Sequence, residues 1–338
     1  MTLISSRRRF IAGAGGTLAA GLLPGIGMAQ GGGVSIDIGT MAAGSAWYQY
    51  GIQFSQYMKP ALPEGSVINV RPYAAADGNL MLIEADDRIQ LGLTFSVNLR
   101  WAHARMTDVT PATADNVRVL FGGIDRYYVA PMVLESFGMD TLSEAIAAER
   151  PLRISTLQAG SLGDITTGLL LRAHGIDEAT LRGWGGSINR VALQAASEAL
   201  VTNRADVWIN PITATHPRAQ ELSFSHPLRF LGLSDAAMAE MEALGYVPNE
   251  LPGGAYPSQA EPVMLPGTVT IAIVHKDMPD EIAYALTSSV IDNLATLKEE
   301  NAGLDDFDLA LAATPAMTGD TPLHPGAERA FRDAGIDI

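Results

Sequence analysis

Two short loops rich in glycine and serine have the composition of an anion-binding site. Residues 39–48 and 158–163 each follow a β-rich run and lead into a helical pattern. A helix N-terminus offers unpaired backbone N–H groups and the positive end of the helix dipole, which suit a carboxylate or a phosphate. Each loop taken alone also fits ordinary N-capping by serine. Together, the two loops predict a ligand site in which they face one another.

Short polar, aromatic and arginine side chains at these and neighbouring strand ends are the candidate ligand contacts. Small polar groups would donate hydrogen bonds, the aromatic pair would wall a pocket, and an arginine would hold a carboxylate in a bidentate pair. The candidates are Thr40, Ser45, Trp47, Tyr48, Thr94, Ser96, Gly160, Ser161 and Asn210 for ligand binding, and Arg71, Arg126 and Arg190 for carboxylate pairing. The aromatic pair also fits a core position, Asn210 a simple turn, and each arginine a surface ion pair.

Catalytic motifs are missing from the sequence. There is no cysteine, which excludes thiolate nucleophiles and cysteine-ligated metals. The six histidines lack metal-ligand spacing, and neither a Gly-x-Ser-x-Gly elbow nor a Ser-x-x-Lys pair occurs. Acidic pairs at 86–87 and 305–306 fall in polar helix-start contexts typical of solvated caps. We therefore predict that the protein is not an enzyme and has no catalytic residue, metal or cofactor.

The elements that must position these residues alternate between strand and helix. Strands are expected at 34–39, 67–71, 89–94, 117–121, 127–134, 152–156, 205–209 and 268–274, and helices at 46–58, 79–84, up to 101, at 160–174, at 190–200 and from 279 onward. A glycine- and proline-rich stretch, 251–267, has the composition of a loop or crossover. The alternation predicts two α/β units with parallel sheets covered by helices, which bind ligands at the carboxyl ends of their strands.

Length and charge narrow the class of protein. Without its first 29 residues the chain has 19 basic and 37 acidic residues, a net charge of −18. Such a chain repels phosphate backbones and anionic lipid, so we predict no nucleic-acid or membrane-surface partner. With 47% hydrophobic and 17% charged residues, it is expected to fold as two globular lobes.

The first 29 residues have the pattern of an export signal. Arginines at 7–9 precede an apolar stretch, 11–28, and small residues up to Ala29 form a cleavage site. The stretch is short, glycine-rich and interrupted by Pro24, so it would span a bilayer poorly. We expect a signal of the twin-arginine type, cleavage near Ala29 and a periplasmic protein; an uncleaved anchor is the alternative.

Several motifs resemble those of a known receptor family. The tail at residues 321–329, TPLHPGAER, is very similar to the Pro-Leu-His-Pro-Gly-Ala run with which that family ends. The run 38–40 and the pair Trp47-Tyr48 are similar to its glycine-rich loop and tyrosine pair. Further similar positions are Asn79-Leu80, 159–161, 205–206 and 274–279. From about Ile36 onward, the chain resembles the TAXI-type solute receptors of TRAP transporters.

This resemblance implies the type II periplasmic binding protein fold, in which two α/β lobes enclose a ligand cleft. Residues 30–125 and 265–338 would form lobe I, and residues 126–264 would form lobe II with the hinge crossovers. Asn79 joins the candidate ligand contacts by its match to the family. The implied function is that of a monomer that captures a small organic acid or amino acid and delivers it to TRAP-type membrane permease subunits. Known ligands of the family are glutamate-like and oxo-dicarboxylate acids.

The chain departs from the family pattern where its pocket would lie. The family commonly has Gln-Ser-Asp where this chain has Phe95-Ser96-Val97, Tyr in place of Trp47, and Pro-Gly-Ser-Gly-Thr in place of residues 159–163. These changes predict a more apolar or differently shaped pocket, with a monocarboxylate or a larger organic acid as alternative ligands. Alternatives to the transport role are a ligand-binding sensor component, an enzyme on the same fold and a tricarboxylate-type receptor.

Overall fold

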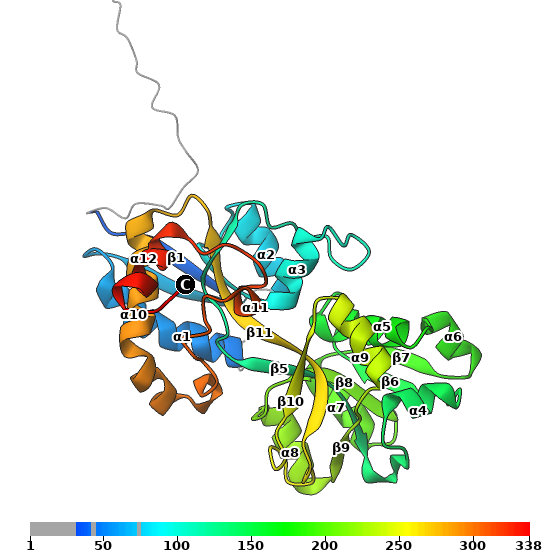
Figure 1. Ribbon diagram of the computed structural model, residues 1–338. Helices are drawn as coiled ribbons and strands as arrows, with labels where there is room; N and C mark the ends of the chain where they lie inside the picture. Colours follow the sequence, from blue (N-terminus) through cyan, green and yellow to red (C-terminus); the bar gives the residue numbers. More distant parts are fainter. Residues whose placement is uncertain (1–31, 42–44, 73–75) are drawn as a thin grey trace, which may run out of the picture.

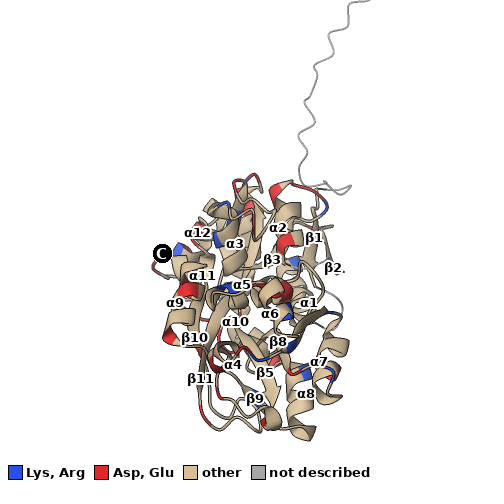
Figure 2. Ribbon diagram, turned by 90° about the vertical axis from the view of Figure 1, so that its right-hand side faces the viewer, with Lys and Arg blue, Asp and Glu red and all other residues tan. Residues whose placement is uncertain are grey.

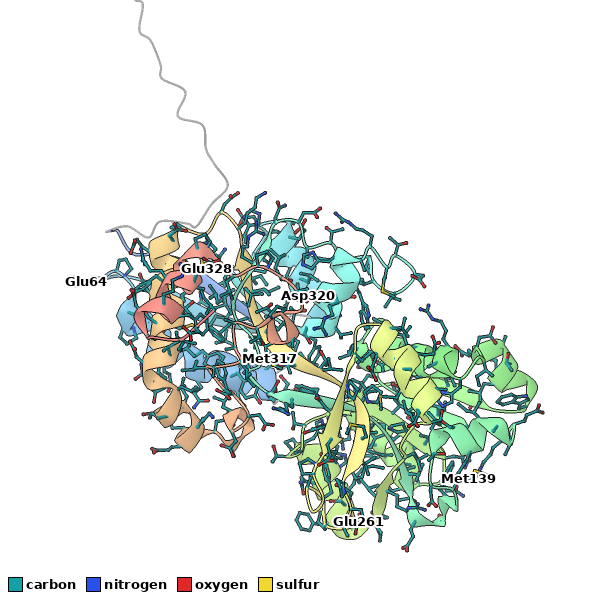
Figure 3. The ribbon with its side chains drawn as sticks, viewed as in Figure 1. Glu64, Met139, Glu261, Met317, Asp320 and Glu328 are labelled. Atoms are coloured by element: carbon teal, nitrogen blue, oxygen red, sulfur yellow. The ribbon has the colours of Figure 1, made fainter. Side chains whose placement is uncertain are left out.

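Two lobes of strands and helices lie beside one another and are joined by two strands (Figure 1). The computed structural model describes residues 32–41, 45–72 and 76–338, so the predicted signal and its cleavage site lie outside the described part. Side chains fill each lobe, with Glu64 and Glu328 on lobe I and Met139 and Glu261 on lobe II (Figure 3). In the described ranges, no helix is both long and apolar enough to cross a membrane.

Lobe I is built on a sheet of three parallel strands continued by two antiparallel ones. Its strands are β1 (Ser35–Thr40), β2 (Val67–Pro72), β3 (Leu91–Phe95), β4 (Val117–Phe121) and the second half of β11 (Val263–His275). Its helices are α1 (Ala46–Met58), η1 (Lys59–Ala61), α2 (Ala76–Glu84), α3 (Ser96–His103), α10 (Asp280–Glu300), η3 (Ala302–Leu304), α11 (Pro315–Thr318) and α12 (Pro325–Asp333). Ile36 and Ile38 alternate inward along β1 and are fully buried in the core that α1 and α10 share.

Lobe II repeats the arrangement with shorter elements. Its strands are β5 (Arg126–Leu134), β6 (Arg153–Thr156), β7 (Ser187–Arg190), β8 (Val207–Ile212), β9 (Leu228–Phe230) and β10 (Val247–Leu251). Its helices are η2 (Glu135–Phe137), α4 (Leu142–Ala147), α5 (Leu162–Ala173), α6 (Glu178–Gly183), α7 (Leu193–Val201), α8 (Pro217–Ser225) and α9 (Asp235–Ala243). Strands β6, β7 and β8 are parallel, and β5 runs antiparallel to β8. Their carboxyl ends therefore lie at the same sheet edge as the start of β5.

Strands β5 and β11 join the lobes. The first half of β11 pairs with β10 and β5, and its second half pairs with β3 and β4. Arg126 at the start of β5 pairs with Val269, and the next residue of β11, Thr270, pairs with Phe95 at the end of β3. One buried hydrophobic cluster, which includes Phe95 and Tyr127, extends through both lobes. The lobe limits given above remain a prediction, because β11 belongs to both sheets.

A second connection fastens α3 of lobe I to the turn between α9 and β10 of lobe II. The indole N–H of Trp101 donates to the carbonyl of Leu244 at 2.7 Å, and this bond is buried. The Trp101 ring meets the edge of Tyr246, with centroids 5.8 Å apart. Arg100 donates to the carbonyl of Gly245 at 2.8 Å. These contacts hold the lobes together at a point outside the two crossing strands.

The predicted alternation of strands and helices is confirmed in both lobes, with three corrections. The sheets are mixed, because β4, β5 and β11 run antiparallel to their neighbours. The helix expected from 190 begins at Leu193, since Arg190 ends the short edge strand β7. Residues 263–267 form the first part of β11, where Leu265 is fully buried. The sequence predicted a loop here because the stretch contains glycine and proline, and neither residue favours a strand interior.

Candidate functional site

The strand ends of both lobes meet at what we call the lobe junction, the start of β5 with the carboxyl ends of β3 and β8. The strand register shows this arrangement. In β11, Val269 lies opposite Arg126, and the next residue, Thr270, lies opposite Phe95 at the end of β3. On the other side of β5, Tyr128 lies opposite Ile212 at the end of β8. Arg126 therefore sits between the strand ends of the two lobes. Ligands of α/β proteins bind at such carboxyl ends.

The first loop brings Thr40, Ser45, Trp47 and Tyr48 to the end of β1, although residues 42–44 lie outside the described part. The Thr40 hydroxyl is buried and donates to the carbonyls of Met41 and Arg71 at 3.0 and 3.2 Å. Ser45 caps α1, accepting from the Tyr48 N–H at 3.2 Å. Tyr48 is half-buried, and its hydroxyl has no hydrogen-bond partner within the described residues.

Trp47 lies in the core beneath the junction. It is fully buried, and its indole N–H donates to the Thr270 hydroxyl at 2.9 Å. Its ring packs against Phe95 at 4.6 Å between centroids, and Phe95 meets the edge of Tyr127 at 4.9 Å. These three rings form an apolar cluster, which we call the aromatic floor, between α1, β3 and β5. Trp47 has no exposed surface. Its predicted role as a wall of the ligand pocket therefore stays a prediction.

Asn79, Thr94 and Ser96 are buried and bonded within lobe I. The Asn79 amide donates to the carbonyls of Gly39 and Leu93 at 3.1 and 2.8 Å, which ties β1 to β3. The Thr94 hydroxyl donates to the Ala76 carbonyl at 3.2 Å. The hydroxyls of Ser96 and Thr268 lie 2.9 Å apart and bond to each other. The structure thus brings these predicted residues to the junction, with their donors engaged by the protein.

The second loop lies at the start of α5, and its backbone is already bonded to a carboxylate of the protein. Gly160 has a positive φ of 79°, and its N–H donates to Asp164 at 3.0 Å. Ser161 caps α5, accepting from the Asp164 N–H at 3.3 Å. The other oxygen of Asp164 accepts from Arg190 at 2.6 Å. Asp164 was not among the predicted residues; the spacing Ser-x-x-Asp at a helix start would have indicated it.

Two of the three candidate arginines are paired with carboxylates. Besides Asp164, Arg190 also bonds both oxygens of Glu178, at 2.8 and 3.2 Å. These pairs raise the pKa of Arg190, with the Glu178 hydrogen bonds as the largest cause. Acidic and basic segments lie side by side around α5 and α6 (Figure 2). Arg71 bonds Asp37 at 2.9 Å on the outer strand β2.

Arg126 differs from the other two. Its side chain is exposed at the junction, and it makes neither a hydrogen bond nor an ion pair with any described residue. Asn210, in contrast, lies inside β8, buried opposite Ala130, where its amide donates to the Pro211 carbonyl at 2.8 Å. Of the three candidate arginines, Arg126 is therefore the one that has no hydrogen-bond or ion-pair partner among the described residues.

Asp125, which sequence reasoning missed, is a fully buried carboxyl next to Arg126. One of its oxygens accepts from the Thr270 N–H at 3.3 Å, and the other has no hydrogen-bond partner. Burial raises its pKa to about 7, although the neighbouring Thr270 and Tyr50 lower the pKa. The sequence did not indicate Asp125, because the two glycines at 122–123 are typical of an ordinary turn between β4 and β5.

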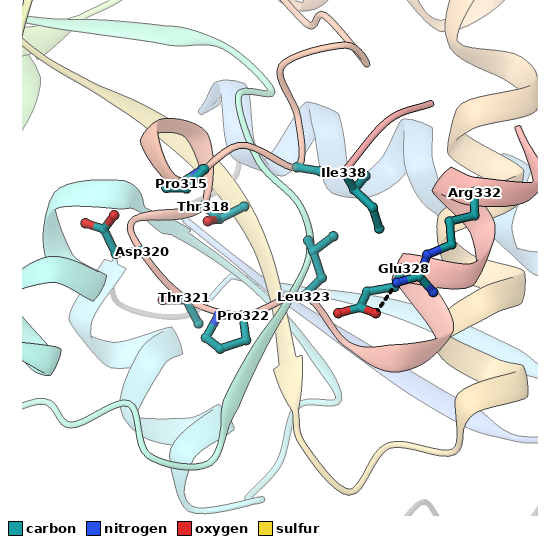
Figure 4. Close-up of a pocket in the computed structure, with 10 residues that line it drawn as sticks. Pro315, Thr318, Asp320, Thr321, Pro322, Leu323, Glu328, Arg332 and Ile338 are labelled. Carbon is teal, nitrogen blue, oxygen red and sulfur yellow. Dashed lines mark hydrogen bonds and ion pairs between the residues drawn. The ribbon is translucent and has the colours of Figure 1, made fainter. Parts of the chain in front are cut away.

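Two hollows of the molecule lie away from Arg126. One of about 410 Å³ is lined by the tail of lobe I, where Glu328 pairs with Arg332 at 2.8 Å (Figure 4). None of the candidate residues lines it. Another of about 310 Å³ lies between α5 and the loop after α3, and includes Arg190. There Arg172 pairs with Asp108 at 3.0 Å across the lobes, so its charges are matched within the protein.

Metal ligands do not gather in the described residues: no group of three or more histidine or acidic side chains is placed to hold an ion. His216, for example, is half-buried at the start of α8, and its desolvation lowers its pKa to about 4. Its Nδ1 accepts from the N–H of Ala219 and caps α8.

Comparison with known proteins identifies the relatives of this chain. A model described as the NMT1-like family matches residues 38–335, and no curated protein matches. The solved structure of MatC from Rhodopseudomonas palustris with bound malate is 14% identical, over 89% of this chain and 96% of its own, with a TM-score of 0.53. The periplasmic binding protein BugD is 14% identical over 90% and 98%, with a TM-score of 0.47. A periplasmic transporter is 15% identical over 89% and 94%, with a TM-score of 0.46. The predicted α/β fold with two lobes is confirmed.

Proposed function

The chain belongs to the NMT1-like family, and from this premise we propose that it is an extracytoplasmic solute-binding protein that captures a small organic acid between its lobes. In its finer form, the proposal is a TAXI-type receptor that passes its ligand to TRAP-type permease subunits. The protein acts as a monomer in the periplasm, after cleavage of its signal near Ala29. It binds its ligand without chemical change.

The observation that carries this proposal is the unpaired guanidinium of Arg126 at the lobe junction. In this acidic chain, Arg71 and Arg190 pair with carboxylates of the protein, whereas Arg126 faces solvent without a partner. A ligand carboxylate would complete its bidentate hydrogen bonds. The position between β3 and β8 lets both lobes contact the rest of the ligand when they close, as in hinge-type closure around a ligand.

The test is a thermal-shift screen of organic and amino acids against the mature chain, residues 30–338. A ligand at a hundredfold excess over its Kd stabilises the folded state by about 2.7 kcal/mol. We expect at least one acid to raise the melting temperature, and Arg126→Ala to weaken its binding by about 10- to 100-fold, the effect of a charged hydrogen bond.

The matched control is Arg88→Ala, which removes an exposed arginine paired with Asp87 at 3.2 Å in lobe I. This variant should bind like the parent. If no acid shifts the melting temperature across a broad panel, the solute-receptor proposal is refuted. Equal weakening by both variants would assign the effect to net charge and exclude Arg126 as the anchor.

Delivery to a permease and export are tested separately in cells. Uptake of the identified acid should stop in a strain that lacks the protein; unchanged uptake with a lost transcriptional response would instead indicate a sensor. Replacing Arg7, Arg8 and Arg9 by lysine should retain folded protein inside the cell if the signal is of the twin-arginine type. Normal secretion of that variant would point to the general export route.

A further inference from the structure

The contacts that join the lobes outside β5 and β11 lie on one side of these strands. Among the described residues, the hydrogen bonds and the ion pair that cross there start from Arg100, Trp101 and Asp108, on α3 and in the loop after it. Their partners lie on α5 and in the turn between α9 and β10. Figure 1 shows α3 and α9 on this side, and α8 and the orange end of α10 on the other. The lobes are therefore supported at two separate places.

Trp101 makes the strongest of these contacts. Its side chain is fully buried, and its indole N–H donates to the Leu244 carbonyl at 2.7 Å. Tyr246, which meets the Trp101 ring, is itself buried, and its hydroxyl is hydrogen-bonded to Thr166 of α5. Parting the lobes here would leave a buried donor and a buried acceptor without partners, which is costly. This contact therefore resists separation from both lobes.

Arg100 fastens the same turn through its backbone. One nitrogen of its guanidinium group donates to the Gly245 carbonyl at 2.8 Å, and another donates to Asp320 of lobe I at 2.9 Å. Gly245 has a positive φ of 94°, and a Cβ added to it would lie 3.4 Å from the Arg100 side chain. The glycine thus lets the turn approach α3 closely while keeping a left-handed backbone.

The ion pair between Arg172 and Asp108 contributes much less. Its two side chains are 50% and 66% exposed, and an exposed pair of this kind has little effect on stability. It lies on the same side as Trp101 but does not hold the lobes there. The second support consequently depends on the buried contact of α3 with the turn after α9.

Two supports at separate places limit how the lobes can move. The crossing strands alone would let lobe II both bend and twist relative to lobe I. A second contact that stays intact leaves one rotation, about a line through the two supports, as in a hinge whose axis is fixed. Parts of the lobes that lie far from this line on the side of α8 then move most.

We infer that the contact of α3 with the turn after α9 is a pivot that stays intact while the lobes move, with Trp101 as its positioning residue, so that the lobe junction opens on the side of α8 and the end of α10. The use of this motion in solute capture rests on the proposed function. The motion itself is tested without a ligand.

The test measures distances between paired spin labels on the mature chain in the absence of any acid. Because the chain has no cysteine, each label pair is introduced by two cysteine substitutions. The pivot pair is Ala104→Cys with Ala243→Cys, at the exposed ends of α3 and α9. The opening pair is Phe224→Cys with Glu299→Cys, both exposed, on α8 and α10. We expect a single narrow distance for the pivot pair and a broad or double distribution for the opening pair.

Trp101→Phe keeps a ring in the contact but removes its N–H donor. In this variant, arrangements with a lengthened pivot-pair distance should become about tenfold more populated, the effect of losing one buried hydrogen bond. The matched control is Trp208→Phe, since Trp208 is also fully buried but its indole nitrogen has no hydrogen-bond partner and lies within lobe II. The control and Arg172→Ala should both leave the pivot-pair distance unchanged.

The outcomes bear on the pivot and leave the solute-receptor function to its own screen. A pivot-pair distribution as broad as that of the opening pair, or two narrow distributions, would refute the pivot. An unchanged pivot-pair distance in Trp101→Phe, or equal lengthening in Trp208→Phe, would contradict the role given to Trp101. Circular dichroism checks that each variant is folded.

Discussion

Replacing Asp125 by asparagine removes a buried carboxyl from the lobe junction while keeping its shape. Burial raises the pKa of Asp125 to about 7, from an ordinary value of 3.8. The groups around it are Thr270, whose N–H donates to it, the neighbouring Tyr50, and the more distant Tyr127 and Asp306. Because one pKa unit corresponds to about 1.4 kcal/mol, ionised Asp125 destabilises the fold by about 4 kcal/mol relative to its protonated form.

The sign of the pH dependence follows from the raised pKa. Below pH 3.8 the carboxyl is protonated in both the folded and the unfolded chain. Between pH 3.8 and about 7 the unfolded chain releases this proton first, so stability falls as the pH rises, and it levels off above pH 7. Asparagine has no such titration. From pH 5 to pH 8, Asp125→Asn should therefore gain about 3 kcal/mol in free energy of unfolding relative to the parent.

The assay is urea denaturation of parent and variant at pH 5 and pH 8, with stability taken from the linear extrapolation. Comparing the two proteins at each pH cancels the titration of every other group. Asp337→Asn, which removes an exposed carboxylate near the C-terminus, is the matched control for the loss of one negative charge. A constant difference between parent and Asp125→Asn at both pH values would refute the reasoning.

Three further predictions concern packing and titration elsewhere. Trp101→Phe removes the buried bond to the Leu244 carbonyl and should lower the free energy of unfolding by about 1–3 kcal/mol in urea melts. Since burial lowers the pKa of His216 from 6.5 to about 4, stability should fall as the pH drops through that window, and His216→Asn should remove about 3 kcal/mol of this loss in pH-resolved melts. Gly326→Ala places a Cβ 2.2 Å from a backbone oxygen of α10 and should destabilise the protein by about 1–3 kcal/mol, while Gly78→Ala, in open space on α2, should be neutral or stabilising. Equal melting temperatures for these two alanine variants would contradict the packing of α12.

Elements with strong local signals could be predicted from the sequence. The helix that starts after Pro279 and the strand that includes 268–274 are α10 and part of β11. Prediction from the sequence pattern was wrong where the local amino-acid composition disfavours a strand that pairing with distant strands nevertheless forms. Gly267 lies inside β11 because it faces Tyr128 of β5 and leaves room for Asn249, whose side chain lies 2.0 Å from the position of an added Cβ. Such a close approach is decided by a strand far away in the sequence.

Site residues were predicted by type and loop position, which does not reveal what already binds them. Trp47 is held by Thr270, 223 residues later, and Ser96 is held by Thr268, 172 residues later. No spacing rule reports a hydrogen bond over such a separation. Periodicity placed these side chains at the right strand ends, but only the folded chain distinguishes an engaged donor from a free one.

The lack of a partner for Arg126 is notable because the chain is acidic. With 37 acidic and 22 basic residues, most arginines find a carboxylate of the protein, as Arg71 and Arg190 do. Arg126 has neither an ion pair nor a hydrogen bond among the described residues, although it lies at a sheet edge where two lobes meet. At Asp164 the opposite holds. There a carboxylate of the protein binds the loop whose composition predicted a ligand site. Under the proposed function, recognition is set by which arginine the protein leaves unpaired, so that exchanging the pairing of Arg126 and Arg190 should move the ligand carboxylate from one lobe to the other.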